Sequence, residues 1–224
     1  MPTRTARRVC AEAEPAKSKT KNANSQTRQV ALALLFIPEF TLHRSRYGVK
    51  LGGEPVDYFL KSERLGFRCW SADDLPLATG LWGDPRVTAF IGGPFTQEQV
   101  RERLAREIRQ METHGVQYWP IFLLESDQHV GCAGLRPYRP EQKVYELGVH
   151  LCPAYWGKGF AVEASRAAIR YAFDALSAKA LFAGHHPENA ASRRLLSKLG
   201  FKRTHEELYP PTGLMHPSYL LRKE

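Results

Sequence analysis

The chain has 224 residues, of which 43% are apolar and 25% charged, enough for one sizeable core but cramped for two full domains. Its net charge of +9 is concentrated at one end: residues 1–55 hold ten Lys and Arg against four Asp and Glu, whereas residues 56–224 hold 22 against 19. Because the body is nearly neutral, we expect no specific nucleic-acid partner.

Residues 1–56 are predicted to be a basic, low-complexity extension and linker, disordered because most of the segment lacks the large apolar side chains that would offset the entropy of ordering. Two other interpretations stay open. The start of the chain could be assigned too far upstream, or the segment could be an organellar transit peptide, although Glu12 and Glu14 argue against the latter. The longest apolar stretch, residues 30–37, is too short to cross a bilayer, so no membrane partner is expected.

The four cysteines are scattered and show no C-x-x-C spacing, which fits a reducing compartment. We therefore expect the protein to be cytoplasmic.

Residues 57–224 are predicted to form one domain. Thr96 and Gln99 form a capping box before an apolar repeat of helical spacing, and three apolar runs separated by polar turns are typical of an antiparallel meander. The alternation of strands and helices predicts an α/β (α+β) domain with a mixed sheet that carries helices on its faces. In chain order, the predicted elements are a strand over 65–70, helices beginning near 71–74 and at 96, strands over 118–125, 129–135 and 144–151, a helix over 162–176, a strand over 180–185, a helix over 189–199, and strands over 201–208 and 214–221.

A glycine-rich turn follows the strand over 144–151. Gly157, Gly159 and the small Ala161 alternate and run directly into a helix, so the turn can present bare backbone amides and the positive end of the helix dipole to an anion such as pyrophosphate. A Walker loop would need Ser or Thr where Gly159 stands, and a dinucleotide fingerprint would need glycine at Val162. A turn that merely reverses the chain remains the alternative.

Two segments carry a family resemblance. HPENAASRRLLSKLGF at residues 186–201 and YWGKGFAVEA at residues 155–164 together resemble the GNAT acetyltransferase superfamily, and within it the branch of ribosomal-protein N-terminal acetyltransferases. The resemblance covers about residues 60–224. It implies a GNAT fold with a central mixed, mostly antiparallel sheet of about seven strands and helices on both faces.

The resemblance also implies where acetyl-CoA binds. It would lie in a V-shaped opening between the strands over 144–151 and 180–185, with its pantetheine bonded to strand backbone and its pyrophosphate on the glycine-rich turn. In this chain Trp156 stands where the family often has Gln or Arg, and Leu196 where many members have a tyrosine acid. The implied cofactor-binding residues are Val149, His150, Leu151, Trp156, Gly157, Lys158, Gly159, Phe160, Ala161, Asn189 and Ser192.

Two residues are candidates for catalysis. Glu146, in an apolar strand beside the cofactor, could accept the proton of the attacking amine, or it could form a structural salt bridge. Ser192 resembles the serine that this branch uses to protonate the leaving thiolate, or it could hydrogen-bond its own helix. Asn189 could cap its helix, contact pantetheine, or do both. Lys158, Arg193 and Arg194 could meet phosphates or form a solvated face.

The expected function is therefore an acetyl-CoA-dependent N-acetyltransferase that acts on a primary amine, with a protein N-terminal α-amino group as the leading acceptor. A small-molecule amine, such as an aminoglycoside or polyamine, and a non-catalytic CoA-binding module are the alternatives. No metal is expected, because His150, His185 and His186 lack a carboxylate or cysteine at ligand spacing. A monomer or homodimer is expected.

Overall fold

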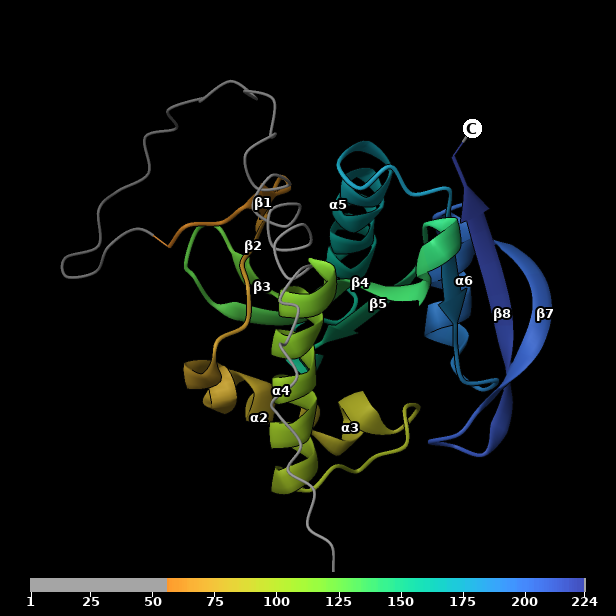
Figure 1. Ribbon diagram of the computed structural model, residues 1–224. Coiled ribbons are helices and arrows are strands. Elements are labelled where there is room, and N and C mark those ends of the chain that lie inside the picture. The colour runs from red at the N-terminus through yellow and green to blue at the C-terminus, as the bar shows by residue number, and fades with distance from the viewer. Residues whose placement is uncertain (1–55, 224) are drawn as a thin grey trace, which may run out of the picture. The chain divides into compact units, whose positions relative to one another are not determined.

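The computed structural model describes residues 56–223, so all of the predicted extension except Val56 lies outside the described residues. Eight strands form one sheet in the order β1-β2-β3-β4-β5-β6-β8-β7 (Figure 1). Every neighbouring pair is antiparallel except β5 with β6, which is parallel. The strands are β1 (Leu60–Lys61), β2 (Leu65–Phe67), β3 (Tyr118–Leu123), β4 (His129–Arg139), β5 (Val144–Leu151), β6 (Ala180–Gly184), β7 (Lys202–Tyr209) and β8 (Leu214–Arg222).

Helices cover both faces of this sheet. Within the described residues they are α2 (Leu75–Trp82), α3 (Pro85–Thr88), α4 (Gln97–His114), α5 (Phe160–Asp174) and α6 (Ala190–Lys198), with short 3-10 turns at Ala72–Asp74, Pro140–Gln142 and Pro153–Tyr155. The fold is thus the predicted mixed, mostly antiparallel sheet with helices on its faces, and the short β1 brings the strand count to eight.

Local sequence signals set the helix ends. The backbone N–H of Thr96 donates to Oε1 of Gln99 at 2.8 Å, and the N–H of Gln99 donates back to Oγ1 of Thr96 at 3.3 Å, which completes the predicted capping box. Helix α4 then ends at Gly115, whose φ of 69° is left-handed. In α5 the left-handed Gly159, with φ 84°, stands at the N-cap, so this helix begins two positions before the predicted residue 162.

The core is divided between the two faces by the alternation of strand residues. Trp119 and Ala133 pack on the α5 side, whereas their chain neighbours Tyr118 and Cys132 pack with α2 and α4. On β5, Leu147 belongs to the α5 side, so Glu146, Gly148 and His150 point toward the α4 side.

Two strand boundaries differ from the prediction. The strand expected over 65–70 ends at Phe67, because the backbone N–H of Trp70 donates to the side chain of Gln117 instead of to a neighbouring strand. The strand expected over 129–135 continues to Arg139, past Pro137, and the register with β5 shifts between Pro137 and Arg139. Proline is tolerated there because it stands at the irregularity.

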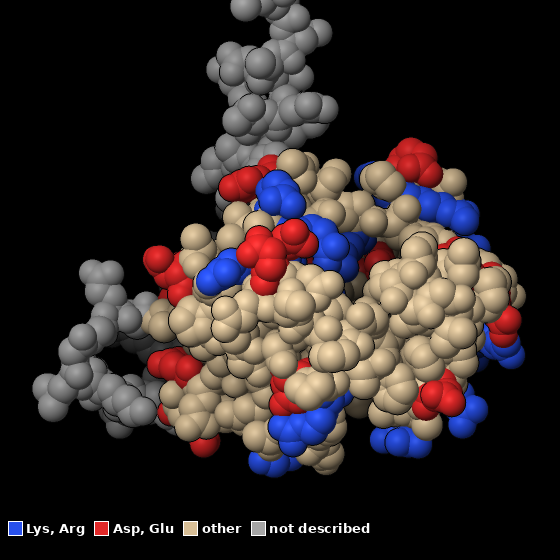
Figure 2. Space-filling model, turned by 90° about the horizontal axis from the view of Figure 1, so that it is seen from below, with Lys and Arg blue, Asp and Glu red and all other residues tan. Residues whose placement is uncertain are grey.

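The lower face of the domain, below α3 and the turn between β7 and β8, is mostly uncharged (Figure 2). It is hollowed between a lobe on the α2 and α4 side and a lobe on the β7 and β8 side. None of the helices between residues 56 and 223 is long and apolar enough to cross a membrane.

Candidate active site

The sheet opens between β5 and β6. Their pairing covers Val144↔Ala180, Tyr145↔Leu181 and Glu146↔Phe182, and it ends there although β5 continues to Leu151 and β6 to Gly184. Beyond this point β5 stays with β4 and β6 stays with β8. The two halves of the sheet therefore diverge, and Glu146 lies at the fork.

The glycine-rich turn after β5 has the shape of an anion cradle. Gly157 and Gly159 have φ of 74° and 84°, and an added Cβ would meet no atom within 4 Å at Gly157 and only the Arg64 guanidinium, at 3.5 Å, at Gly159. Between residues 56 and 223, the backbone N–H groups from Gly157 to Val162 find no protein acceptor. Free amides, open space and a helix N-terminus together fit the pyrophosphate of acetyl-CoA.

The predicted turn residues do not all contribute free donors. Trp156 donates its backbone N–H to the Pro153 carbonyl at 3.2 Å and its indole N–H to the Leu151 carbonyl at 2.8 Å, so it shapes the turn. Phe160 puts its ring into the core, 7% exposed, while its amide stays at the helix start. The Lys158 ammonium lies 5.5 Å from the ring centroid of Tyr155.

An ion pair fastens this turn to the start of the domain. Arg64 pairs with Glu163 in the first turn of α5 at 2.6 Å, and it also donates to the Lys158 carbonyl at 3.3 Å. The same Glu163 carboxylate accepts from the Ser62 hydroxyl and from the Arg64 backbone N–H, each at 2.7 Å. These bonds lower the pKa of Glu163, against the effect of its partial burial, so the carboxylate remains charged and holds the turn in place.

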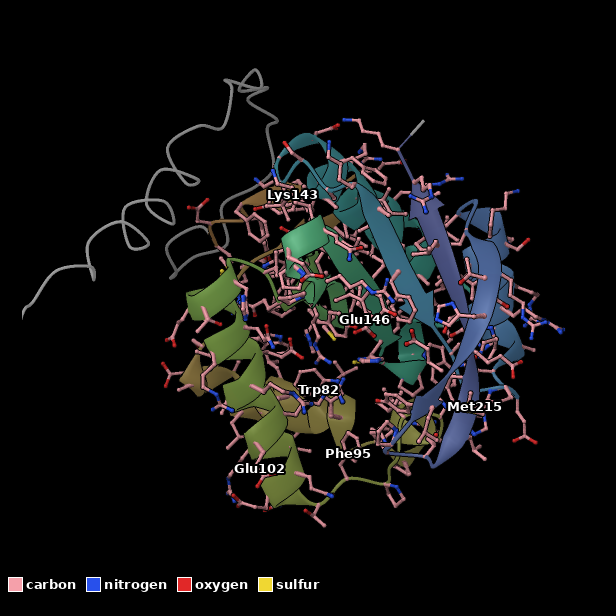
Figure 3. All side chains as sticks on the ribbon, turned by 45° about the vertical axis from the view of Figure 1, so that its right-hand side comes forward. Trp82, Phe95, Glu102, Lys143, Glu146 and Met215 are labelled. Atoms are coloured by element: carbon pink, nitrogen blue, oxygen red, sulfur yellow. The ribbon has the colours of Figure 1, made fainter. Side chains whose placement is uncertain are left out.

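Glu146 lies in a largely buried polar cluster. Its partner across β4 and β5 is Arg136, and Figure 3 shows Glu146 above Trp82 and Phe95, between helix α4 and the strands β7 and β8. Burial raises the pKa of the Glu146 carboxyl, against the opposing effects of Arg136 and a hydrogen bond from Tyr118. A carboxylate with a raised pKa at the fork of the sheet is suited to accept a proton.

Arg136 and Glu107 form the base of this cluster. Their side chains make an ion pair in which Glu107 is fully buried, and the other Glu107 oxygen accepts the backbone N–H of Tyr118 at 3.0 Å. The Arg136 guanidinium also stacks over the Tyr118 ring, 4.0 Å from its centroid. Gly148 makes room for this ring, because a Cβ at that position would collide with it. The cluster holds the Tyr118 ring against β5.

His150 is neutral in this environment. Its Nδ1 accepts the indole N–H of Trp82 at 3.3 Å and lies 3.6 Å from the Cys132 sulfur. Burial lowers the pKa of His150 well below 6.5, and Arg103 and Arg136 lower it further. Since Nδ1 accepts, the ring proton lies on Nε2.

Two predicted residues lie at the start of α6. Asn189 caps this helix, because its Oδ1 accepts the backbone N–H of Ser192 at 3.0 Å. The Ser192 hydroxyl is partly exposed and forms no hydrogen bond with its own helix or with any other described residue, so it is free to bind a ligand. Leu196 packs in the core instead, 5% exposed. Arg193 and Arg194 are exposed.

Two loops meet below the opening. Gly92 lies against Pro211 in the turn between β7 and β8, where a Cβ on the glycine would stand 2.8 Å from the proline carbonyl oxygen. Beside them, the ring centroids of Phe90 and His186 are 5.0 Å apart, and those of His186 and His216 are 5.5 Å apart. The loop after α3, the segment after β6 and the hairpin of β7 and β8 therefore lie side by side. Among residues 56–223, no group of His, Cys, Asp or Glu is arranged to hold a metal ion.

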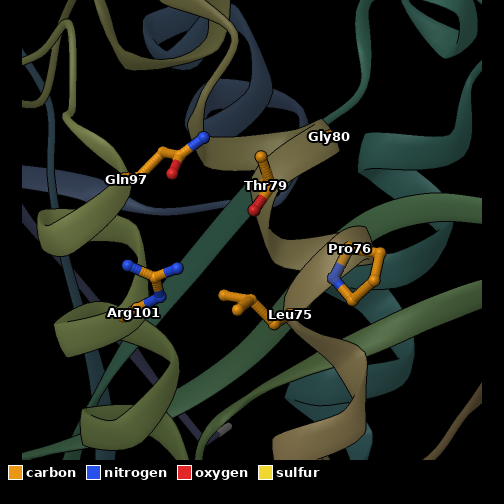
Figure 4. Close-up of a pocket in the computed structure, with 6 residues that line it drawn as sticks. All are labelled: Leu75, Pro76, Thr79, Gly80, Gln97 and Arg101. Atoms are coloured by element: carbon orange, nitrogen blue, oxygen red, sulfur yellow. The ribbon is translucent and has the colours of Figure 1, made fainter.

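A separate hollow of about 560 Å³ lies between α2 and the start of α4 (Figure 4). It contains none of the predicted site residues. Its lining is formed by Leu75, Pro76, Thr79, Gly80, Gln97 and Arg101.

The charged cluster on the α4 side was not expected from the sequence. Arg103 and Glu107 are 6% and 0% exposed, and both lie on the apolar stripe of α4 next to Leu104. Charged residues at core positions of an amphipathic helix were the available signal, because Arg and Glu are almost never fully buried without a partner.

Comparisons with known proteins point to one family. The profile of the family described as "Acetyltransferase (GNAT) domain" matches residues 64–202. The "Uncharacterized N-acetyltransferase p20" of Bacillus licheniformis is 32% identical over 146 residues, which cover 64% of this chain and 82% of that protein. A GNAT-family acetyltransferase structure from Bacillus anthracis has a TM-score of 0.63 and 25% identity, covering 73% of this chain and 97% of its own. A further similar structure is that of RimL, a ribosomal L7/L12 alpha-N-protein acetyltransferase in complex with coenzyme A. Its TM-score is 0.64, and the match covers 74% of this chain and 98% of that one. At 15% identity, this similarity shows the fold alone.

Proposed function

The chain belongs to the GNAT acetyltransferase family, and on that premise we propose that it transfers an acetyl group to the α-amino group of a peptide or protein N-terminus. It is an acetyl-CoA-dependent acyltransferase. The observation that carries the choice of acceptor is Glu146, a partly buried carboxylate of raised pKa at the fork between β5 and β6.

The glycine-rich turn and β5 would hold the donor. Acetyl-CoA supplies an acyl group activated as a thioester. The free amides from Gly157 to Val162 offer donors for its pyrophosphate, and the backbone of β5 from Val149 to Leu151, which has no partner strand on its β6 side, offers donors and acceptors for pantetheine. Asn189 would touch the same arm while capping α6.

Glu146 would take the proton of the acceptor amine. An α-amine has a reference pKa of about 7.7 to 8.0, against about 10.4 for lysine, so an N-terminal amine loses its proton far more readily at neutral pH. A partly buried carboxyl of raised pKa is a stronger base than an ordinary glutamate, so the difference in pKa between Glu146 and an α-amine is smaller still. This match favours an α-amine over a lysine side chain.

Ser192 would return a proton to the leaving thiolate. Its hydroxyl is free of protein partners among the described residues, as such a donor must be before it meets the sulfur. A thiol with a reference pKa of about 8.5 already leaves easily, so the contribution of this proton is small.

The catalytic domain would be residues 57–224, with residues 1–56 as a dispensable extension. The family match from residue 64 to residue 202 supports this division. A protein that begins at Asp57 should fold and bind acetyl-CoA as the full chain does; loss of binding would assign the extension a role in the domain.

The experiment that tests the function is acetyl-CoA turnover against a panel of acceptors. The panel contains peptides with different first residues, the same peptides with blocked N-termini and an internal lysine, a polyamine and an aminoglycoside. We expect turnover with free N-termini that blocking abolishes. Turnover with the small amines alone would replace the peptide acceptor, and acetyl-CoA binding without turnover on any amine would contradict catalysis.

A further inference from the structure

Arg103 is a buried cation that has no hydrogen-bond or ion-pair partner among the described residues. Its side chain leaves α4 toward Trp82 of α2, and the residue is 6% exposed. The guanidinium lies 4.9 Å from the ring centroid of Trp82 and 5.7 Å from that of Phe95. Its Nε is buried without a hydrogen-bond acceptor, and no ion pair joins Arg103 to any residue between 56 and 223.

The nearby carboxylates are already engaged. One oxygen of Glu107 pairs with Arg136, and the other accepts the backbone N–H of Tyr118. Glu146 interacts with Arg136 across the strands and with Tyr118. Arg103 thus adds a second guanidinium to a region whose carboxylates have other partners. A charge taken from water without a counter-charge is costly, and burial lowers the pKa of Arg103.

The unpaired guanidinium belongs to the acceptor side of the site. Arg103 is close enough to Glu146 to oppose the rise in its pKa, and close enough to His150 to lower the pKa of that ring further. Trp82, over which it stacks, donates to His150 on β5. Figure 3 places Trp82 and Phe95 below Glu146 in the space between α4 and the β7 and β8 strands. An anion that reached Arg103 would lie on the same face of the sheet as the proposed base.

From this arrangement we infer that Arg103 binds a carboxylate of the acceptor, so that the preferred substrate is a primary amine that also carries a carboxylate. The inference rests on the proposed acetyl transfer to amines. A guanidinium offers a planar fork of donors that matches two carboxylate oxygens.

The positive charge that Arg103 offers suits a single carboxylate rather than a phosphate. Of the two guanidinium groups, Arg136 already has Glu107, which leaves a single free positive charge. Such an acceptor has two sources with the same chemistry, a small amino acid derivative and a peptide with an acidic residue near its N-terminus.

Two matched pairs of acceptors distinguish these sources. The small pair is glutamic acid α-amide and glutamine α-amide; the peptide pair is Ala-Glu-Ala-amide and Ala-Gln-Ala-amide. The two members of each pair carry the same α-amine, and they differ only in that one has a side-chain carboxylate where the other has an amide. We expect wild-type kcat/KM to be about tenfold to a hundredfold higher for the carboxylate member of the pair that the site accepts, because a charged hydrogen-bonded pair is lost with the amide.

The variant Arg103→Met should bring this ratio close to one, whereas Arg109→Met, on the exposed face of the same helix, should keep it. The thermal midpoint of Arg103→Met should equal or exceed that of the wild type, because methionine removes an unpaired buried charge. A wild-type ratio near one in both pairs would overturn the inference and leave acetyl transfer intact. A large drop in midpoint with the ratio retained would also overturn it, and no turnover on any of the four acceptors would overturn the proposed function itself.

Discussion

The indole N–H of Trp82 donates to Nδ1 of His150 at 3.3 Å, which links α2 to the strand that carries Glu146. The bond occupies the nitrogen that a general base would need, and burial keeps the pKa of His150 well below 6.5. Of the two titratable side chains that β5 presents on this face, Glu146 is therefore the candidate for proton transfer.

Replacing Glu146 with glutamine should lower kcat by about 10² to 10⁴-fold with little change in acetyl-CoA affinity, because the amide keeps the shape of the carboxylate but cannot take a proton. Steady-state kinetics and calorimetry measure the two quantities. Glu188→Gln, an exposed substitution before α6, is the control. A kcat near that of the wild type would assign Glu146 a structural role.

The pH profile gives an independent check on Glu146. Its pKa is raised above 4.5 by burial, so wild-type activity should fall as the pH drops through that raised pKa. Tyr118, Arg136, Glu107 and Arg103 are the charged and titratable groups around it. In Glu146→Gln this acidic limb should disappear, and the remaining activity should rise with pH as the amine deprotonates unaided. An unaltered limb would exclude Glu146 as its source.

Gly159→Val should abolish acetyl-CoA binding, because a branched side chain would stand beside the free amides of the turn. The positive φ also makes valine strained, at a cost of about 1 to 2 kcal/mol. Gly115→Val is the matched control: it has a similar φ of 69° and open space, but it ends α4. Calorimetry should find affinity lost in the first variant and kept in the second, with comparable losses in thermal midpoint. If the two variants bound acetyl-CoA with equal affinity, the glycine-rich turn would only reverse the chain and would not bind the ligand.

Ser192→Ala should lower kcat by less than about tenfold, because the leaving thiol needs little help. Its affinity for acetyl-CoA should hold, since the cap on α6 uses the Ser192 backbone N–H, which alanine retains. Ser197→Ala, exposed on the same helix, is the control. A loss beyond a hundredfold would make the serine an essential acid.

His129 should make the fold sensitive to acid. Its ring lies against Trp70 and Phe122, and burial lowers the pKa of His129 to about 4. Between pH 6.5 and 4, His129 is protonated in the unfolded chain but stays neutral in the folded chain. The free energy of unfolding therefore falls on acidification, by about 2 kcal/mol at pH 5. His129→Gln should lose less thermal midpoint between pH 7 and 5 than the wild type, and exposed His114→Gln should behave as the wild type does. Equal losses in His129→Gln and wild type would mean that another group titrates.

Local signals in the sequence predicted several elements of the fold. The capping box at Thr96 and the helix boundary at Gly200 depend on a few adjacent residues, and the structure reproduces both. The predicted strand over 144–151 is β5 with the same bounds, because its apolar run ends in a turn at Pro153.

The charged cluster depends on contacts that no local pattern encodes. Arg136 comes from β4, Glu107 from α4 and Tyr118 from β3, and only the packing of α4 on the sheet brings them together. The same packing leaves Arg103 without a partner between residues 56 and 223. Local sequence patterns therefore predicted the elements of the proposed donor half, β5 and the turn into α5, whereas the acceptor half depends on tertiary contacts.

Because the parallel seam between β5 and β6 is short, we expect the two halves of the sheet to open as separate units. Backbone pairing between them ends at Glu146↔Phe182, while each strand remains fully paired on its outer side. A ligand that bonds to the backbones of both β5 and β6 would take the place of the hydrogen bonds that these two strands do not form with each other beyond Glu146 and Phe182. Amide hydrogen exchange should then slow on β6 and β8 as well as on β5 when acetyl-CoA binds, because the two units would open together instead of separately.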